Sequence, residues 1–100
     1  MTEQSPLTLE SRVRISEDVL FQDLQGEAVL LNLNSGVYYG LDPVGTRVWQ
    51  LLGTHEKLAD IASAVLDEFE VEKQTCEADL LALMGELEKR GLVTACSDVA

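Results

Sequence analysis

The sequence predicts an α+β fold in which a small three-stranded antiparallel sheet is followed by three helices. Up to Asp42 the chain carries short β-prone segments separated by turn residues, and beyond it the apolar residues recur at helical spacing. Asp42-Pro43 marks the change, because Asp caps free N–H groups and Pro suits the first helical position. The length of 100 residues fits one domain. We place this domain at 12–96, between a flexible tail at 1–11 and a frayed end at 97–100.

The first strands are predicted from β-prone runs and alternation. Arg12–Ile15 alternates charged and apolar residues, as a short strand at the edge of the sheet would. Val19–Leu24 is β-prone and ends at the turn signal Gln25-Gly26. Residues 28–33 form the next strand, whose alternate apolar residues share one face: Val29, Leu31 and Leu33.

A hairpin leads into the third strand of the sheet. Asn34-Ser35-Gly36 supplies residues that tolerate positive φ, and it predicts a tight turn. The chain then returns through 37–41, with one face made of Val37, Tyr39 and Leu41. This meander leaves at least one sheet edge with nothing in the chain to pair with.

The helices are predicted from their caps and apolar stripes. The first ends at Gly53, the second runs over 56–69 with Thr54 as its cap, and the third runs over 75–90 and ends at Gly91. Their inward residues are Val44, Val48, Leu51 and Leu52, then Leu58, Ile61, Ala62, Val65, Leu66 and Phe69, then Leu80, Leu83, Met84 and Leu87. Residues 92–94 would pair with the sheet or cover the core. Three helices beside a small sheet make a winged-helix-like domain.

The charge of the chain excludes some partners of such a fold. The chain has seven Lys and Arg against 18 Asp and Glu, which gives a net charge of −11 at pH 7. Nucleic acids and anionic membranes bind through cationic side chains, so neither is an expected partner. The third helix, which reads DNA in many related folds, is acidic too: Glu77, Asp79, Glu86 and Glu88 outnumber Lys89 and Arg90. A nucleic-acid-binding regulator remains a rival interpretation, and a nucleic-acid-binding assay at low salt tests it.

The chain offers little to catalysis. His55 is the only histidine and has no second metal ligand nearby, and Cys76 and Cys96 form no CxxC pair. No phosphate-cradling glycine motif is present. We therefore expect a protein that is not an enzyme and that has no cofactor and no metal. The rival hypothesis is a small enzyme with a cysteine nucleophile. The N-terminus lacks a secretory signal, so we expect the cytoplasm.

The unpaired strand edge is the most informative feature. Natural proteins blunt exposed edges with Pro or Lys, and the five residues of this strand include neither: Val37, Tyr38, Tyr39, Gly40 and Leu41. Such an edge can take up an extended peptide by β-augmentation. The alternative is that Tyr38 and Tyr39 pack locally and the edge binds nothing.

These residues also resemble a known family. The runs 28–42 and 45–52, together with 58–62, 79–80 and 87–93, resemble the PqqD-like family of precursor-peptide recognition elements, and the likeness extends over residues 12–94. The resemblance implies a non-catalytic protein that binds the leader segment of a ribosomally made, modified peptide. In the family the leader adds to the third strand, here 37–41, and its side chains lie against the third helix.

The resemblance leaves several alternatives open. At about 100° per residue, one flank of the third helix carries Leu81, Met84 and Glu88, which would form the groove wall, and the other carries Ala82 and Lys89. Core packing of Leu81 and Met84 is equally open. The turn Asn34-Ser35-Gly36 differs from the Pro-Glu-Gly-like turn of PQQ-pathway members, so we favour a lasso-peptide or related cluster. Expected partners are a precursor leader peptide and a maturation enzyme (protease, cyclase or radical-type), and the chain is a monomer or a homodimer.

Overall fold

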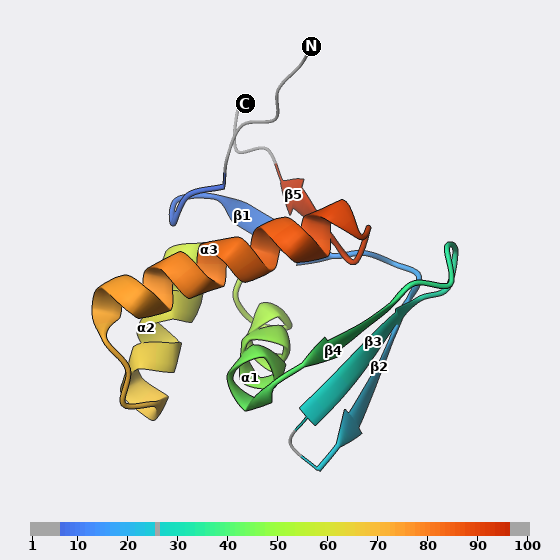
Figure 1. Ribbon diagram of the computed structural model, residues 1–100. Coiled ribbons are helices and arrows are strands. Elements are labelled where there is room, and N and C mark those ends of the chain that lie inside the picture. The colour runs from blue at the N-terminus through green and yellow to red at the C-terminus, as the bar shows by residue number, and fades with distance from the viewer. Residues whose placement is uncertain (1–6, 26, 97–100) are drawn as a thin grey trace.

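The computed structural model describes residues 7–25 and 27–96 (Figure 1). It confirms the α+β class, with a three-stranded antiparallel sheet before three helices. In chain order the elements are β1 (Arg12–Ile15), β2 (Val19–Leu24), β3 (Glu27–Asn32), β4 (Tyr38–Leu41), α1 (Pro43–Leu52), α2 (Leu58–Glu68), α3 (Lys73–Lys89) and β5 (Val93–Cys96). None of the helices among the described residues combines the length and the apolar run that a bilayer crossing requires.

The main sheet has the strand order β2-β3-β4, so β4 lies at an edge. Its register places Leu30 opposite Phe21 on one side and Tyr39 on the other. Leu30 is fully buried, and the ring of Phe21 stacks on Trp49 of α1 with 6.4 Å between centroids. The face that carries Val29 is therefore the outer face, because the register turns Leu30 toward the helices.

The expectation that Arg12–Ile15 extends the edge of this sheet is wrong. β1 instead pairs antiparallel with β5 in a separate two-stranded sheet, in which Val13 is opposite Ala95 and Ile15 opposite Val93. Residues 92–94 accordingly do not join the main sheet either. Val13 and Val93 are both buried, which explains the pairing: the two ends of the described chain bury apolar side chains against the same core.

The first helix begins where the sequence predicts. Asp42 Oδ1 accepts a hydrogen bond from the backbone N–H of Gly45 at 2.7 Å, and Pro43 stands at the start of α1. This cap joins β4 directly to α1, so the edge strand and the helix have a fixed relative position.

The predicted cap of the second helix is wrong. α2 begins at Leu58, not at residue 56, and the Thr54 hydroxyl donates back to the Leu51 carbonyl at 3.3 Å. The first N–H groups of α2 instead donate to the segment before β1: Leu58 to Ser11 at 3.1 Å and Ala59 to Leu9 at 2.9 Å. A backbone segment distant in sequence therefore satisfies the groups that a side-chain cap satisfies in other helices.

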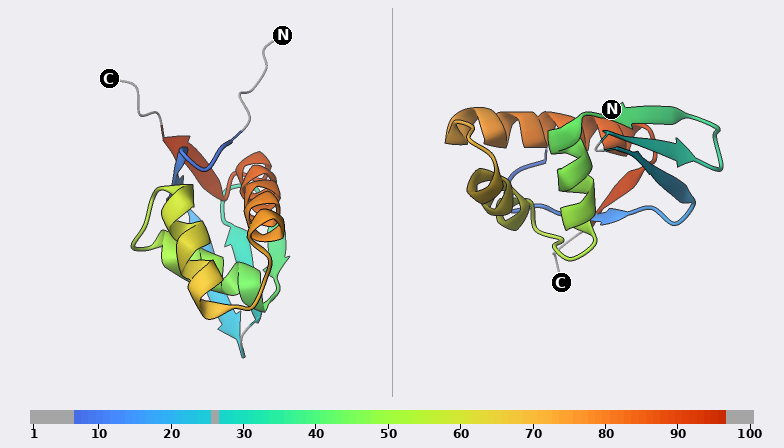
Figure 2. Two further views of the ribbon diagram at one scale, coloured as in Figure 1. Left: turned by 90° about the vertical axis from the view of Figure 1, so that its left-hand side faces the viewer. Right: turned by 90° about the horizontal axis from the view of Figure 1, so that it is seen from below.

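The helices surround one core. α1 lies between α2 and the three-stranded sheet, and α3 runs across both (Figure 2). Fully buried side chains include Leu30, Leu58, Ile61, Met84, Leu87 and Leu92. Four predicted core residues are only partly buried against it: Val44, Leu66, Phe69 and Leu83.

The proposed domain limits stay a prediction. Leu7 and Leu9, within the predicted tail, pack against the core. Residues 1–6 of that tail and the predicted frayed end, 97–100, lie outside the described residues, as does Gly26 of the predicted turn. α3 begins at Lys73, two positions before the predicted Thr75.

Candidate functional site

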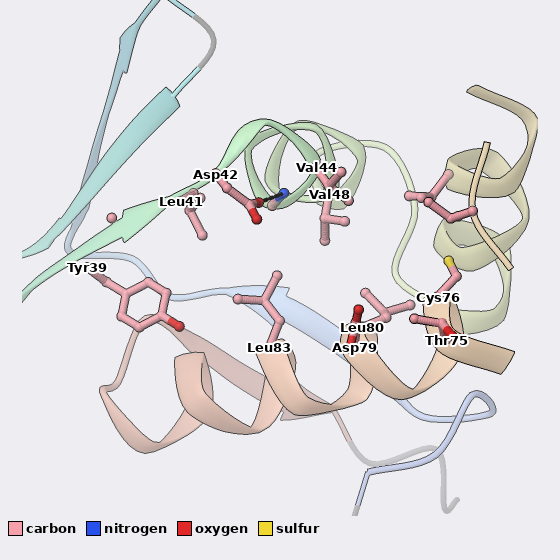
Figure 3. Close-up of a pocket in the computed structure, with 14 residues that line it drawn as sticks. Tyr39, Leu41, Asp42, Val44, Val48, Thr75, Cys76, Asp79, Leu80 and Leu83 are labelled. Carbon is pink, nitrogen blue, oxygen red and sulfur yellow. Dashed lines mark hydrogen bonds between the residues drawn. The ribbon is translucent and has the colours of Figure 1, made fainter. Parts of the chain in front are cut away.

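A cleft of about 470 Å³ separates β4 from α3, with α1 along one side (Figure 3). It is lined by Tyr39, Gly40, Leu41, Asp42, Val44, Gly45, Val48, Val65, Val71, Thr75, Cys76, Asp79, Leu80 and Leu83. The sequence brings these together in two steps: the Asp42 cap turns β4 into α1, and the apolar stripe of α3 then packs across the core from that strand.

The β4 side of the cleft is a free strand edge. The Asn32 N–H donates to the Val37 carbonyl at 2.9 Å, which sets the phase of the ladder between β3 and β4. Since hydrogen-bonded positions alternate in an antiparallel pair, Tyr38 and Gly40 direct their backbone N–H and C=O groups away from β3. Within the described residues no strand pairs with this edge. The edge can therefore accept a further strand.

The floor of the cleft is apolar. Leu41, Val48 and Leu80 are buried there, and Val44 and Leu83 are half-buried at its sides. Asp79 and Thr75 are exposed at the α3 rim. A surface with an apolar floor, a polar rim and an unpaired backbone edge suits an extended peptide that places alternate side chains into the floor.

Cys76 lies at the α3 side of the cleft as a buried free thiol. Burial raises the pKa of Cys76, and the negative charges of Glu77 and Asp79 raise it further. The thiolate is the nucleophilic form of cysteine, and a raised pKa keeps the thiol protonated near neutral pH. This environment suits packing rather than nucleophilic catalysis.

The described residues also present no metal-binding cluster. Across 7–25 and 27–96, no three His, Cys, Asp or Glu side chains gather closely enough to hold an ion. His55 Nδ1 lies 2.8 Å from the Thr54 hydroxyl and 3.3 Å from the Leu51 carbonyl, in the turn between α1 and α2.

The five predicted strand residues occupy different positions at this site. Tyr39, Gly40 and Leu41 line the cleft. Val37 is half-buried just before β4 begins, and Tyr38 is 68% exposed on the outer face of the sheet. Their contact with a peptide stays a prediction.

The α3 residues predicted to form the groove wall do not border this cleft. Met84 is fully buried in the core, Leu81 is half-buried against it, and Glu88 is exposed, and none of the three borders the cleft. Ala82 and Lys89, on the alternative flank, are exposed and do not border it either. The bordering residues are Thr75, Cys76, Asp79, Leu80 and Leu83.

The groove wall predicted from sequence does not include Asp79 and Leu83, which line the cleft. The helical period identifies the core stripe through Leu80 and Leu87 but is symmetric about it, so it does not say which flank faces β4. Sequence reasoning likewise places Val44 and Val48 in the core alone, since nothing in the sequence distinguishes a side chain under a cleft from one under a neighbouring helix.

Comparison with known proteins gives a family and two related structures. Residues 27–93 match the family model described as coenzyme PQQ synthesis protein D (PqqD). A solved structure described as TbiB1 in complex with the TbiA(beta) leader peptide is 35% identical, with a TM-score of 0.77, covering 85% of this chain and 99% of that one. A second, lasso peptide synthetase B1 complexed with the leader peptide, is 30% identical, with a TM-score of 0.72, covering 83% and 98%. No curated protein gives a significant match.

Proposed function

Because this chain belongs to the PqqD family, we propose that it binds the leader segment of a ribosomally made precursor peptide and presents that peptide to a maturation enzyme, without catalysis of its own. The observation that carries the proposal is the free edge of β4 beside an apolar cleft. The leader peptides present in both similar structures support it.

In the proposed complex the leader adds to β4 as a fourth strand of the main sheet. Its backbone hydrogen-bonds to the outward groups of Tyr38 and Gly40, which give affinity independent of sequence. Alternate leader side chains then point into the cleft between Leu41 and Leu83, where their burial gives specificity.

Holding the leader raises the local concentration of the precursor at the enzyme, and tethering of this kind needs no chemistry from the tether. The two leader-bound structures favour a lasso-peptide or related cluster. A PQQ-biosynthesis precursor is the alternative, which the name of the family model supports. The enzyme partner is a protease, a cyclase or a radical-type modifying enzyme, and the site of action is the cytoplasm. The winged-helix description and the choice between monomer and homodimer stay predictions.

A nucleic-acid-binding role has weaker support. The chain has a net charge of −11 at pH 7, and α3 presents Asp79 at the cleft rim rather than a row of cationic side chains. A low-salt gel shift tests this role: retarded DNA or RNA at micromolar protein would favour it over peptide binding.

The direct test is fluorescence anisotropy with a labelled leader peptide from the precursor encoded beside the gene. We expect saturable binding to the wild-type chain. Gly40→Pro removes the N–H that faces the open edge, so it should weaken binding at least tenfold. Gly40→Ala is the matched control, since an added Cβ meets no atom within 4 Å and the N–H remains. No saturation with the wild type at high micromolar concentration would overturn the proposal.

A second pair of variants tests the cleft without touching the strand. Leu83→Gln places a polar group in the half-buried cleft wall, and Glu88→Gln changes the flank of α3 predicted from sequence. Binding that falls severalfold for Leu83→Gln alone would support the cleft as the leader site. A loss for Glu88→Gln alone would instead favour the predicted flank.

A further inference from the structure

Asp79 places an uncompensated carboxylate at the rim of the cleft. Figure 3 shows its side chain directed from α3 toward α1, beside Leu80. Asp79 is exposed and makes neither a hydrogen bond nor an ion pair with any other described residue. A carboxylate with all its acceptor capacity free can bind a cationic donor from a ligand.

Several charged side chains of the helices have partners within the described residues. Arg47 makes two hydrogen bonds to Glu68, at 2.8 and 2.9 Å, and Arg90 pairs with Glu86 at 3.2 Å. The second carboxylate of the cleft, Asp42, accepts from the backbone N–H of Gly45 at 2.7 Å. Asp79 is therefore the lining carboxylate without a partner among the described residues.

We propose that Asp79 selects leader peptides that carry Lys or Arg at the position passing the α3 rim. This inference rests on the proposed function and names the class of leader that the site prefers. The aliphatic stem of such a side chain can pack on half-buried Leu83 while its charged end reaches the Asp79 carboxylate. An acidic side chain at the same position meets repulsion from Asp79 and from the net charge of −11.

The expected size of the preference follows from exposure. Exposed ion pairs contribute little, so neutralising Asp79 should weaken binding of a basic leader about two- to fivefold. Salt screens exposed pairs, so the difference should shrink as ionic strength rises. Reversing the charge at residue 79 should reverse the preference.

The experiment measures binding of the labelled leader from the neighbouring precursor gene, with each position replaced in turn by Lys, Gln and Glu. The receptors are the wild type, Asp79→Asn and Asp79→Lys. Glu77→Lys is the matched control, because it makes the same change of sign on α3 at a residue that does not line the cleft. Circular dichroism checks that each variant is folded.

The supporting result is one leader position at which the wild type prefers Lys over Glu, Asp79→Asn loses the preference, and Asp79→Lys reverses it, while Glu77→Lys keeps it. Leaders that bind the wild type and all variants with the same pattern would overturn the role of Asp79 and leave leader binding intact. If no leader binds the wild type, the proposed function fails and the inference fails with it.

Discussion

The guanidinium of Arg90 lies over the ring of Tyr39, with its carbon 5.0 Å from the ring centroid. Arg90 follows α3 and Tyr39 belongs to β4, so this contact joins the two elements that border the cleft. The guanidinium is also held by Glu86 through a 3.2 Å bond from Nη2. One cation–π contact therefore bridges β4 and the end of α3.

A double-mutant cycle measures that contact. Tyr39→Leu and Arg90→Ala should show a coupling of about 0.5–1 kcal/mol in the free energy of unfolding by urea, the usual size for cation–π pairs near the surface. The control cycle combines Arg90→Ala with Tyr38→Leu, because the ring of Tyr38 is exposed on the outer face. Equal coupling in both cycles would show that the ring contact is not its source.

Asn32 should be the most sensitive polar side chain of the fold. It is 8% exposed, its Nδ2 donates to the Arg90 carbonyl at 3.0 Å, and its Oδ1 accepts from the Asn34 N–H at 2.9 Å. It thus ties the turn before β4 to the end of α3. Asn32→Ala removes these part-buried hydrogen bonds and should cost about 1–2 kcal/mol of unfolding free energy.

The control for Asn32 is Asn34→Ala. Among the described residues the side-chain amide of Asn34 bonds only to exposed Asp18, at 2.9 Å, so its removal should change stability by less than about 0.5 kcal/mol. Equal destabilisation by the two variants, measured by chemical denaturation, would contradict the distinct role of Asn32.

Cys76 should react slowly with iodoacetamide in the folded protein. Its raised pKa means that the thiolate forms only at higher pH than in a free thiol, so the rate should climb as pH is raised through the alkaline range. Asp79→Asn removes one of the charges that raise this pKa and should speed the reaction. Bound leader should slow it, because Cys76 lines the cleft. Mass spectrometry of the peptide containing Cys76 gives the rate, and fast labelling unaffected by pH or leader would be the contrary result.

The ion pair between Arg47 and Glu68 should make stability depend on acid. The hydrogen bond from Arg47 lowers the pKa of Glu68. A carboxyl whose pKa is lowered by folding stabilises the protein fully above its ordinary pKa, and this contribution is lost as pH falls through the lowered value. The melting temperature of Glu68→Gln should therefore lie below that of the wild type near neutral pH, and the two should converge in acid.

Exposed Glu70 provides the control for that pair. Glu70 makes no ion pair with the other described residues, so Glu70→Gln should melt like the wild type at both pH values. Since Arg47 and Glu68 are both solvent-accessible, the effect should be small and should diminish at high salt. If the gap in melting temperature between Glu68→Gln and the wild type widens in acid, the ion pair does not stabilise the fold in this way.

Elements that depend on neighbours along the chain can be predicted from the amino-acid order. The Asp42-Pro43 start of α1, the turn before β4 and the apolar stripe of α3 all follow from local backbone preferences and periodicity, and so does the absence of edge-blocking Pro or Lys in 37–41. These features, with the family resemblance, were enough to identify the β4 edge as the candidate site.

What lies across from that edge depends on contacts between segments distant in sequence. The pairing of β1 with β5 and the capping of α2 by Leu9 and Ser11 join segments far apart in sequence, for which no local pattern exists. The same holds for α3: its period is symmetric about the core stripe, and with α3 packed against α2 and β5, Asp79 and Leu83, rather than Leu81 and Glu88, line the cleft. Side-chain period determines which residues are buried, but the rotation of a helix about its axis is set by the neighbours it packs against.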